Sequence, residues 1–120
     1  MAMSDVDDRE CAGEPEDLGR LFLERASAGD VDGIVALYEP GAVLASPPGG
    51  LATGLAAIRQ VYEDLLATKP HFSGDVRPAL RKGDLALTST RFQGGATAEV
   101  ARRQADGTWL WLADQPNVVG

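Results

Sequence analysis

Hydrophobic residues at helical spacing predict two helices early in the chain. The first is expected from about residue 15 to residue 28, because Leu18, Leu21 and Phe22 fall on one face. Acidic residues in its first turn would favour the positive end of the helix dipole. A glycine ends this helix, and Asp30 is a typical N-cap for a second, shorter one. The apolar stripe of the second helix consists of Val31, Ile34, Val35 and Tyr38.

After the second helix the pattern predicts a strand, a turn and a third helix. The strand is AVLAS (residues 42–46), and the turn is the PPGG that follows it. The third helix is expected to begin near Thr53 and to end before Pro70. Its inward face carries Ile58, Val61, Tyr62, Leu65 and Leu66.

From about residue 71 onward the pattern changes to β-strands. A strand over residues 71–81 is interrupted by Pro78, which lacks a backbone N–H and so predicts an edge or a bulge. Turn sequences follow at Lys82-Gly83-Asp84, Gly94-Gly95 and Asp106-Gly107. Helices followed by four consecutive strands indicate an α+β domain, in which helices cover one face of a curved antiparallel sheet.

The acidic charge is concentrated at the start of the chain. The 120 residues carry a formal net charge of −7, and the 44% of hydrophobic residues fits one small globular domain. Residues 1–17 hold seven acids and one base and account for −6 of this charge. With Val6 almost the only apolar residue before Leu18, this stretch cannot bury enough surface to offset its ordering entropy. We therefore expect a disordered acidic leader over residues 1–16 and a single domain over residues 17–120.

Composition argues against several classes of partner and cofactor. The acidic balance, with no run of more than two basic residues, disfavours binding to nucleic acid. The single cysteine, Cys11, cannot form an internal disulfide and has no Cys or His at metal-ligand spacing. No apolar run approaches a membrane span, and the first ten residues lack a signal-peptide pattern. These features predict a cytoplasmic protein without a metal, and no binding to a membrane.

The last hairpin is expected to bring two carboxyl groups together. If Asp106-Gly107 forms a two-residue turn, Glu99 lies directly opposite Asp114. Two like charges across a ladder are unfavourable by up to about 1 kcal/mol when exposed, so the presence of this carboxyl pair requires an explanation. In an apolar cleft, burial and mutual repulsion raise carboxyl pKa values, which yields a general acid and a general base. The alternative is a structural network in which Arg91 or Arg103 neutralises the pair.

The same register assigns the faces of the hairpin. Leu110 and Leu112 share the face of the two acids, whereas Trp109 and Trp111 lie on the opposite face beside Val100. If that opposite face is exposed, the two indoles form an apolar patch suited to a dimer interface. We therefore expect the tryptophans at the surface of the protein.

The orientation of Arg91 depends on the turn after it. A two-residue turn at Gly94-Gly95 places Thr90 opposite Glu99 and Arg91 on the tryptophan side. One extra loop residue makes Arg91 face Glu99, where it could hold an anionic or enolate substrate. The sequence leaves both arrangements open.

Four segments follow one another in a characteristic order: GDVDGIVALYEPGAVLASPPGGLATGLAAIRQVYEDLL, GDLALTSTRF, AEVARRQADGTW and WLADQP. In order and spacing they resemble the nuclear transport factor 2-like superfamily, in its SnoaL-like and ketosteroid-isomerase-like branch. The resemblance covers about residues 18–117. It implies a cone-shaped curved antiparallel sheet packed on the N-terminal helices, with an internal cavity for a ligand and often a homodimer formed through the outer surface of the sheet.

Most positions that correspond to functional residues of the steroid isomerases carry a different residue in this sequence. Ser46, before a proline, stands where those enzymes have an aspartate base, and Phe22 stands where they have a tyrosine that binds the oxyanion. Glu99 matches their second oxyanion donor, a protonated aspartate. The steroid isomerase mechanism is therefore not expected, because one of its three functional groups survives.

The SnoaL-like polyketide cyclases resemble this chain at the last strand, where their aspartate acts as acid and base. Asp114 matches that location. The resemblance implies cofactor-free acid-base catalysis of the cyclase, isomerase or dehydratase type on an apolar oxygenated metabolite such as a polyketide, and the alternative is a non-catalytic ligand-binding or dimerisation module. The expected catalytic residues are Asp114 and Glu99, and the expected substrate contacts are Ser46, Phe22, Tyr38, Tyr62, Arg91 and Leu112.

Overall fold

Three helices form in the segments whose apolar spacing predicts them. The computed structural model describes residues 9–46 and 49–118 of the chain. Within these ranges the helices are α1 (Glu16–Ser27), α2 (Val31–Val35) and α3 (Leu55–Ala67). Asp30 caps α2 as predicted, because its carboxylate accepts a hydrogen bond from the N–H of Gly33 at 3.0 Å. Tyr38, predicted in the second helix, instead begins the first strand.

The strands of the described ranges are β1 (Tyr38–Ser46), β2 (Gly50–Thr53), β3 (Asp75–Val76), β4 (Leu80–Lys82), β5 (Leu85–Thr88), β6 (Thr90–Phe92), β7 (Gly95–Ala96), β8 (Ala98–Arg103) and β9 (Trp109–Gln115). The strand predicted over residues 71–81 is divided into β3 and β4. Pro78 lies between them, as expected for a residue that cannot donate a ladder hydrogen bond.

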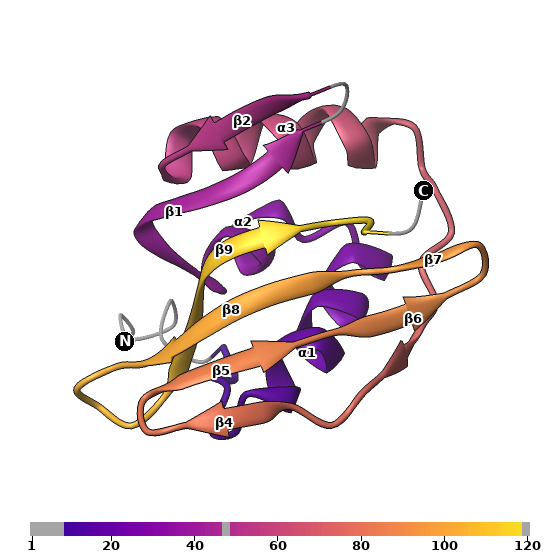
Figure 1. Ribbon diagram of the computed structural model, residues 1–120. Coiled ribbons are helices and arrows are strands. Elements are labelled where there is room, and N and C mark those ends of the chain that lie inside the picture. The colour runs from indigo at the N-terminus through magenta and orange to yellow at the C-terminus, as the bar shows by residue number, and fades with distance from the viewer. Residues whose placement is uncertain (1–8, 47–48, 119–120) are drawn as a thin grey trace.

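The strands build one large curved sheet and one small sheet, with the helices on one face of the large sheet (Figure 1). The large sheet has the order β2-β1-β9-β8-β5-β4, and the small sheet has the order β3-β6-β7. Neighbouring strands are antiparallel except β1 and β9, which run parallel. The predicted α+β class is confirmed. In the described ranges no helix is long and apolar enough to cross a membrane.

The two tryptophans lie in the core, so the prediction that they form an exposed patch is wrong. Trp109 is 1% exposed and Trp111 is 3% exposed. The reason is the length of the last turn: the N–H of Gln104 bonds to the carbonyl of Thr108 at 2.7 Å, which leaves three residues in the loop instead of two. This extra residue reverses the face of the following strand and turns both indoles toward the helices.

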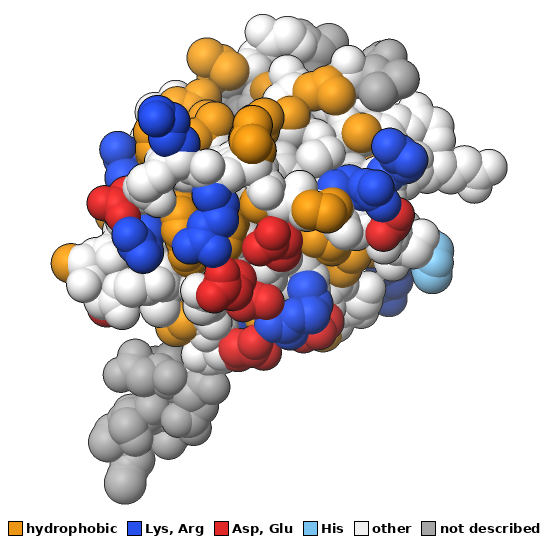
Figure 2. Space-filling view, turned by 60° about the horizontal axis from the view of Figure 1, so that its bottom comes forward, with side chains coloured by type: hydrophobic (Ala, Val, Ile, Leu, Met, Phe, Trp, Pro, Cys, Tyr) orange, Lys and Arg blue, Asp and Glu red, His pale blue; other side chains and the backbone are white. Residues whose placement is uncertain are grey.

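The outer face of the large sheet carries an apolar row that is partly open to solvent. Five residues that pair across neighbouring strands form one row over it, Val43, Ala113, Val100, Leu87 and Leu80. Leu87 is 49% exposed and Leu80 is 71% exposed. Hydrophobic side chains gather in the upper half of Figure 2, with Lys and Arg beside them. We call these five residues the outer row.

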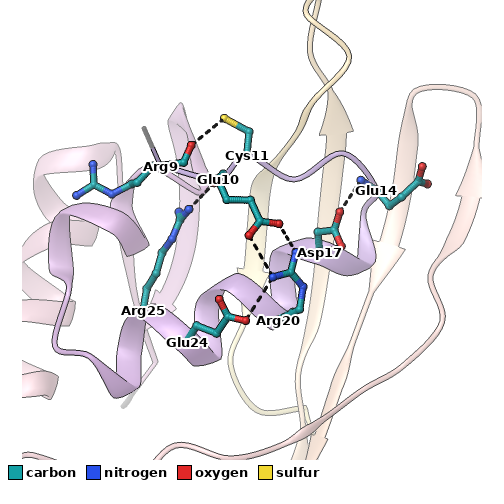
Figure 3. Close-up of polar contacts among 8 residues, drawn as sticks. All are labelled: Arg9, Glu10, Cys11, Glu14, Asp17, Arg20, Glu24 and Arg25. Atoms are coloured by element: carbon teal, nitrogen blue, oxygen red, sulfur yellow. Dashed lines mark hydrogen bonds and ion pairs between the residues drawn. The ribbon is translucent and has the colours of Figure 1, made fainter. Parts of the chain in front are cut away.

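Residues immediately before α1 pack on the domain (Figure 3). Ala12 is 2% exposed, and its carbonyl accepts a hydrogen bond from the N–H of Trp109 at 2.9 Å. The buried guanidinium of Arg25 donates to the backbone carbonyl of Glu10. The predicted disordered leader therefore extends too far, because main-chain contacts tie its last residues to the fold. Residues 1–8 lie outside the described residues.

Candidate functional site

Glu99 on β8 lies directly opposite Asp114 on β9, as the sequence predicts. Both side chains belong to the inner face of the sheet, where Glu99 is 5% exposed and Asp114 is 9% exposed. The register arises from two irregularities that compensate each other. The loop is one residue longer than predicted, and a bulge at Leu112 in β9 then restores the pairing of Val100 with Ala113. The bulge therefore places the tryptophans and Asp114 on the same face.

A chain of two tyrosines ends on Asp114. The hydroxyl of Tyr38 donates a hydrogen bond to Oδ2 of Asp114, and it lies 2.7 Å from the hydroxyl of Tyr62 on α3. A phenol has one hydrogen to donate, and Tyr38 gives it to the carboxyl group. Tyr62 is therefore the donor to Tyr38, and the chain runs from α3 through β1 to β9.

The surroundings of Asp114 shift its pKa in two opposite directions. Burial raises the pKa to about 6, while the hydrogen bond from Tyr38 favours the charged form and limits the rise. Tyr38 is the one hydrogen-bond donor to this carboxyl group among the described residues. No fully buried polar side-chain atom in the described part of the chain lacks a hydrogen-bond partner.

The carboxyl group of Glu99 has its own hydrogen-bond partner, on strand β5. The hydroxyl of Thr88 on β5 donates to Oε1 of Glu99 at 2.6 Å, and it accepts a hydrogen bond from Nε1 of Trp111 at 3.0 Å. Burial, followed by the nearby charge of Asp114, raises the pKa of Glu99 to about 7. Hydrogen bonds from Thr88 and Thr97 oppose this rise.

Aromatic rings surround the two carboxyl groups on the helix side. The ring centroids of Phe22 and Tyr62 are 5.8 Å apart in an edge-on arrangement, and those of Tyr38 and Trp111 are 5.4 Å apart. Phe72 contacts Phe22 at 5.9 Å. Such rings exclude water from the carboxyl pair and give it a low dielectric, which is the condition for raised acid pKa values.

Neither arginine neutralises the carboxyl pair, so that structural interpretation is wrong. Arg91 is exposed on β6 in the small sheet, where it pairs with Asp75 and Ala96. Arg103 binds Asp84 at 2.6 Å. Arg91 therefore does not face Glu99, because the adjacent strand β5 and not β6 supplies the opposite residue.

Two further predicted contact residues lie away from the hydrogen bonds of the pair. Ser46 ends β1, where it pairs with Gly50 and is half-buried. Leu112 is half-buried at the bulge of β9. Phe22, Tyr38 and Tyr62, in contrast, lie beside the carboxyl groups or in the aromatic cluster that surrounds them.

Sequence reasoning missed Thr88, Thr97, Phe72 and the inward position of Trp111. The strand pairing could have identified Thr88, because a turn centred on Gln93-Gly94 pairs it with Glu99. The sequence pattern instead favours a turn one residue later, at Gly94-Gly95, which makes Thr90 the expected partner of Glu99. The neighbourhood of Phe72 carries no comparable signal, since it depends on how a loop packs against α1.

The sequence matches the SnoaL-like domain over residues 20–115. The chain belongs to the SnoaL-like domain family. This places it in the nuclear transport factor 2-like superfamily, as the resemblance implied. Among curated proteins none matches this chain.

Solved structures share the fold of this SnoaL-like domain at low sequence identity. A protein of Thiobacillus denitrificans, provisionally named a calcium/calmodulin-dependent protein kinase type II association domain, is 18% identical with a TM-score of 0.71, over 90% of this chain and 98% of that one. A ketosteroid isomerase-like protein of Erwinia carotovora atroseptica is 18% identical with a TM-score of 0.67, over 83% and 89%. A nuclear transport factor 2-like protein of unknown function from Shewanella oneidensis is 16% identical with a TM-score of 0.66, over 82% and 92%. At such identities these similarities establish the fold alone.

A shallow groove of about 290 Å³ lies over the outer face of the sheet. Its walls include Val43, Leu51, Leu87, Val100 and Ala113. Glu99 and Asp114 also border it, although their carboxyl groups bond to Thr88 and Tyr38 on the inner side. The internal cavity implied by the resemblance stays a prediction.

Proposed function

We propose that this SnoaL-like domain performs cofactor-free acid-base catalysis on a small, apolar, oxygenated metabolite such as a polyketide. Asp114 is the base, and Glu99 is the acid or the donor to an oxyanion. The observation that carries the proposal is the direct pairing of two buried carboxyl groups whose hydrogen bonds differ. Two buried acids directly opposite each other on a ladder cost stability, which favours a functional reason for the pair.

The pair holds one proton over a narrow range near neutral pH. Its two carboxyl groups have pKa values of about 6 and about 7, with the lower value at Asp114 and the higher at Glu99. Between these values Asp114 is charged and Glu99 keeps its proton. This is the arrangement in which a base and an acid act in the same step.

Proton transfer by this pair accounts for the three reaction types. Oδ1 of Asp114 takes a proton from a carbon beside a carbonyl group, and the electron pair of that bond moves toward the carbonyl oxygen. Glu99 donates a hydrogen bond or its proton to that oxygen in an isomerisation or an aldol closure. In a dehydration Glu99 gives its proton to the departing hydroxyl group, which leaves as water. Phe22 and Tyr62 would contact the apolar body of the substrate.

The steroid isomerase mechanism is not part of this proposal. Phe22 offers no hydroxyl group to an oxyanion, and Ser46 offers no carboxylate base. Asp114, on the last strand, provides the base from another position.

The second candidate function is a dimerisation or binding module, favoured by the outer row. We propose a homodimer, formed in the cytoplasm, in which the outer rows of two copies cover each other. Exposed side chains such as Leu51 and Leu80, each 71% exposed, would then leave solvent. This interface uses Val100 but not the tryptophans. It is compatible with catalysis on the inner face, so the two proposals are separable.

A general probe of proton abstraction tests the catalytic proposal without knowledge of the substrate. We would use 5-nitrobenzisoxazole: a base removes its C3 proton, the N–O bond breaks, and a coloured cyanonitrophenolate forms. Asp114 would accept the C3 proton and Glu99 would donate to the phenolate oxygen. Asp114→Asn should lower kcat/KM by at least about 100-fold, the scale of general-base catalysis.

The matched control is Glu39→Gln, which removes a carboxyl group that pairs with Arg102 at 2.9 Å outside the site. This variant should retain the rate of the unaltered protein. An equal rate in Asp114→Asn and the unaltered protein would contradict the assignment of the base and favour the binding module.

A further inference from the structure

The hydrogen bonds around Glu99 have a defined direction. The indole N–H of Trp111 can only donate, so the oxygen of Thr88 must accept it. The hydroxyl hydrogen of Thr88 then points to Oε1 of Glu99, 2.6 Å away. Trp111, Thr88 and Glu99 thus form a chain that starts at a donor and ends at a carboxyl oxygen.

The reverse direction at the last contact would leave a hydrogen without a partner. If Oε1 carried a proton and donated it to Thr88, the hydroxyl oxygen would accept two hydrogen bonds, and its own hydrogen would need another acceptor. Thr88 is 5% exposed, and its hydroxyl contacts Glu99 and Trp111 alone among the described residues. A buried donor without a partner is costly, so this state is disfavoured.

We infer that Trp111 and Thr88 are positioning residues that keep Oε1 of Glu99 an acceptor and so make Oε2 the oxygen that carries and delivers the proton. The inference rests on the proposed function, because it assigns a task to the acid of that site. The acidic groups that interact with Glu99 are the carboxyl group of Asp114 on β9 and the phenol of Tyr62 on α3. The hydroxyl group of Thr97 also donates a hydrogen bond to the carboxyl group of Glu99.

The chain also makes Trp111 a reporter of the charge on Glu99. When Glu99 loses its proton, the hydrogen bond from Thr88 becomes charge-assisted and shortens. The hydroxyl oxygen of Thr88 then becomes a better acceptor, and the indole hydrogen bond strengthens in turn. The indole N–H resonance of Trp111 should therefore move as Glu99 titrates.

The test follows the two indole signals of the full chain by proton–nitrogen NMR between pH 5 and 9. The protein has two tryptophans, and Trp109, whose ring lies near the guanidinium groups of Arg81 and Arg103, serves as the internal reference. The Trp111 signal should titrate with a midpoint at about pH 7, following Glu99, and the Trp109 signal should not. A Trp111 signal that does not change over this range would overturn the inference.

Three substitutions sharpen the test. Thr88→Ser keeps the hydroxyl group and should preserve the titration of Trp111, whereas Thr88→Val and Glu99→Gln should abolish it. Thr68→Val makes the same chemical change at an exposed site whose hydroxyl bonds to the carbonyl of Leu65, and it should leave the titration intact. Persistence of the titration in Thr88→Val would overturn the proposed chain.

The same variants test the hydrogen-bond chain from Trp111 to Glu99 and the proposed reaction independently. With 5-nitrobenzisoxazole, Thr88→Val should lower kcat by about tenfold, the effect of one misplaced hydrogen bond, with little change in KM, and Thr88→Ser should recover most of it. If turnover depends on Asp114 but the Trp111 signal does not titrate, the proposed hydrogen-bond chain from Trp111 to Glu99 is wrong. If the Trp111 signal titrates but no such turnover is found, the hydrogen-bond chain is supported and the proposed function is wrong.

Discussion

Glu99 and Asp114 face each other across two adjacent strands, and each receives a hydrogen bond from a different hydroxyl group on the inner side of the sheet. Tyr38 supports the charge of Asp114, while Glu99 lies within the influence of that charge and keeps its proton to higher pH. The two acids are chemically similar, so their surroundings and not their identities divide the roles of base and acid.

The stability of the domain should fall as pH rises from 5 to 8. Burial raises the pKa of Glu99 from 4.5 to about 7, so the folded state binds a proton that the unfolded state has lost. The stabilising effect is complete below the unfolded pKa and disappears as pH rises through the folded value. A shift of this size corresponds to roughly 3 kcal/mol. Urea unfolding at a series of pH values measures it.

Glu99→Gln is the matched variant for this pH dependence. Its amide stays neutral and its oxygen can still accept the hydrogen bond from Thr88. The loss of unfolding free energy between pH 5 and 8 should therefore be markedly smaller than in the unaltered protein. An identical slope in both proteins would show that Glu99 has an ordinary pKa.

Tyr38→Phe should change Asp114 in a predictable direction. The substitution removes the hydrogen bond that lowers the pKa of Asp114, so this pKa should rise above about 6. The acidic limb of the pH–rate profile with 5-nitrobenzisoxazole should move to higher pH. Tyr62→Phe is the comparison, because it leaves the contact between Tyr38 and Asp114 in place, and it should move the limb less. Equal movement in both variants would contradict the tyrosine order.

Leu87→Glu should prevent assembly through the outer row. Leu87 is 49% exposed and lies in the outer row between Val100 and Leu80, where a second copy would bury its side chain against apolar groups. Burying an unpaired charge there is costly, so the variant should be monomeric. Leu65→Glu places the same charge on an exposed part of α3 and should leave assembly unchanged. Sedimentation velocity distinguishes the outcomes, and a Leu87→Glu dimer would exclude this interface.

The sequence predicted the fold class and the carboxyl pair because both follow from local spacing. The apolar periods of α1 and α3 and the acidic residues of the last hairpin are visible in one dimension. The face of the tryptophans was not predictable in the same way. It depends on one additional loop residue and one bulge at Leu112, which compensate each other at Asp114 but not at Trp111.

The position of Thr88 opposite Glu99 depends on similarly small differences. Shifting the turn by one residue, from Gln93-Gly94 to Gly94-Gly95, moves the expected partner to Thr90. The hydrogen bonds between the tyrosines and Asp114 could not be predicted either, because the apolar spacing assigns Tyr38 to a helix, whereas it begins β1. The tyrosine contacts depend on the packing of segments that are distant in the sequence, and they leave no periodic signal in it.

The most direct test of the central claim is the titration of the two carboxyl carbons in protein labelled with carbon-13 at Asp and Glu. Glu99→Gln and Asp114→Asn assign the two signals. We predict midpoints at about pH 7 for Glu99 and about pH 6 for Asp114, well above the values near 4 of ordinary exposed acids. Two midpoints near pH 4 would contradict the proposed roles, because both groups would then be charged at neutral pH and no acid would remain beside the base.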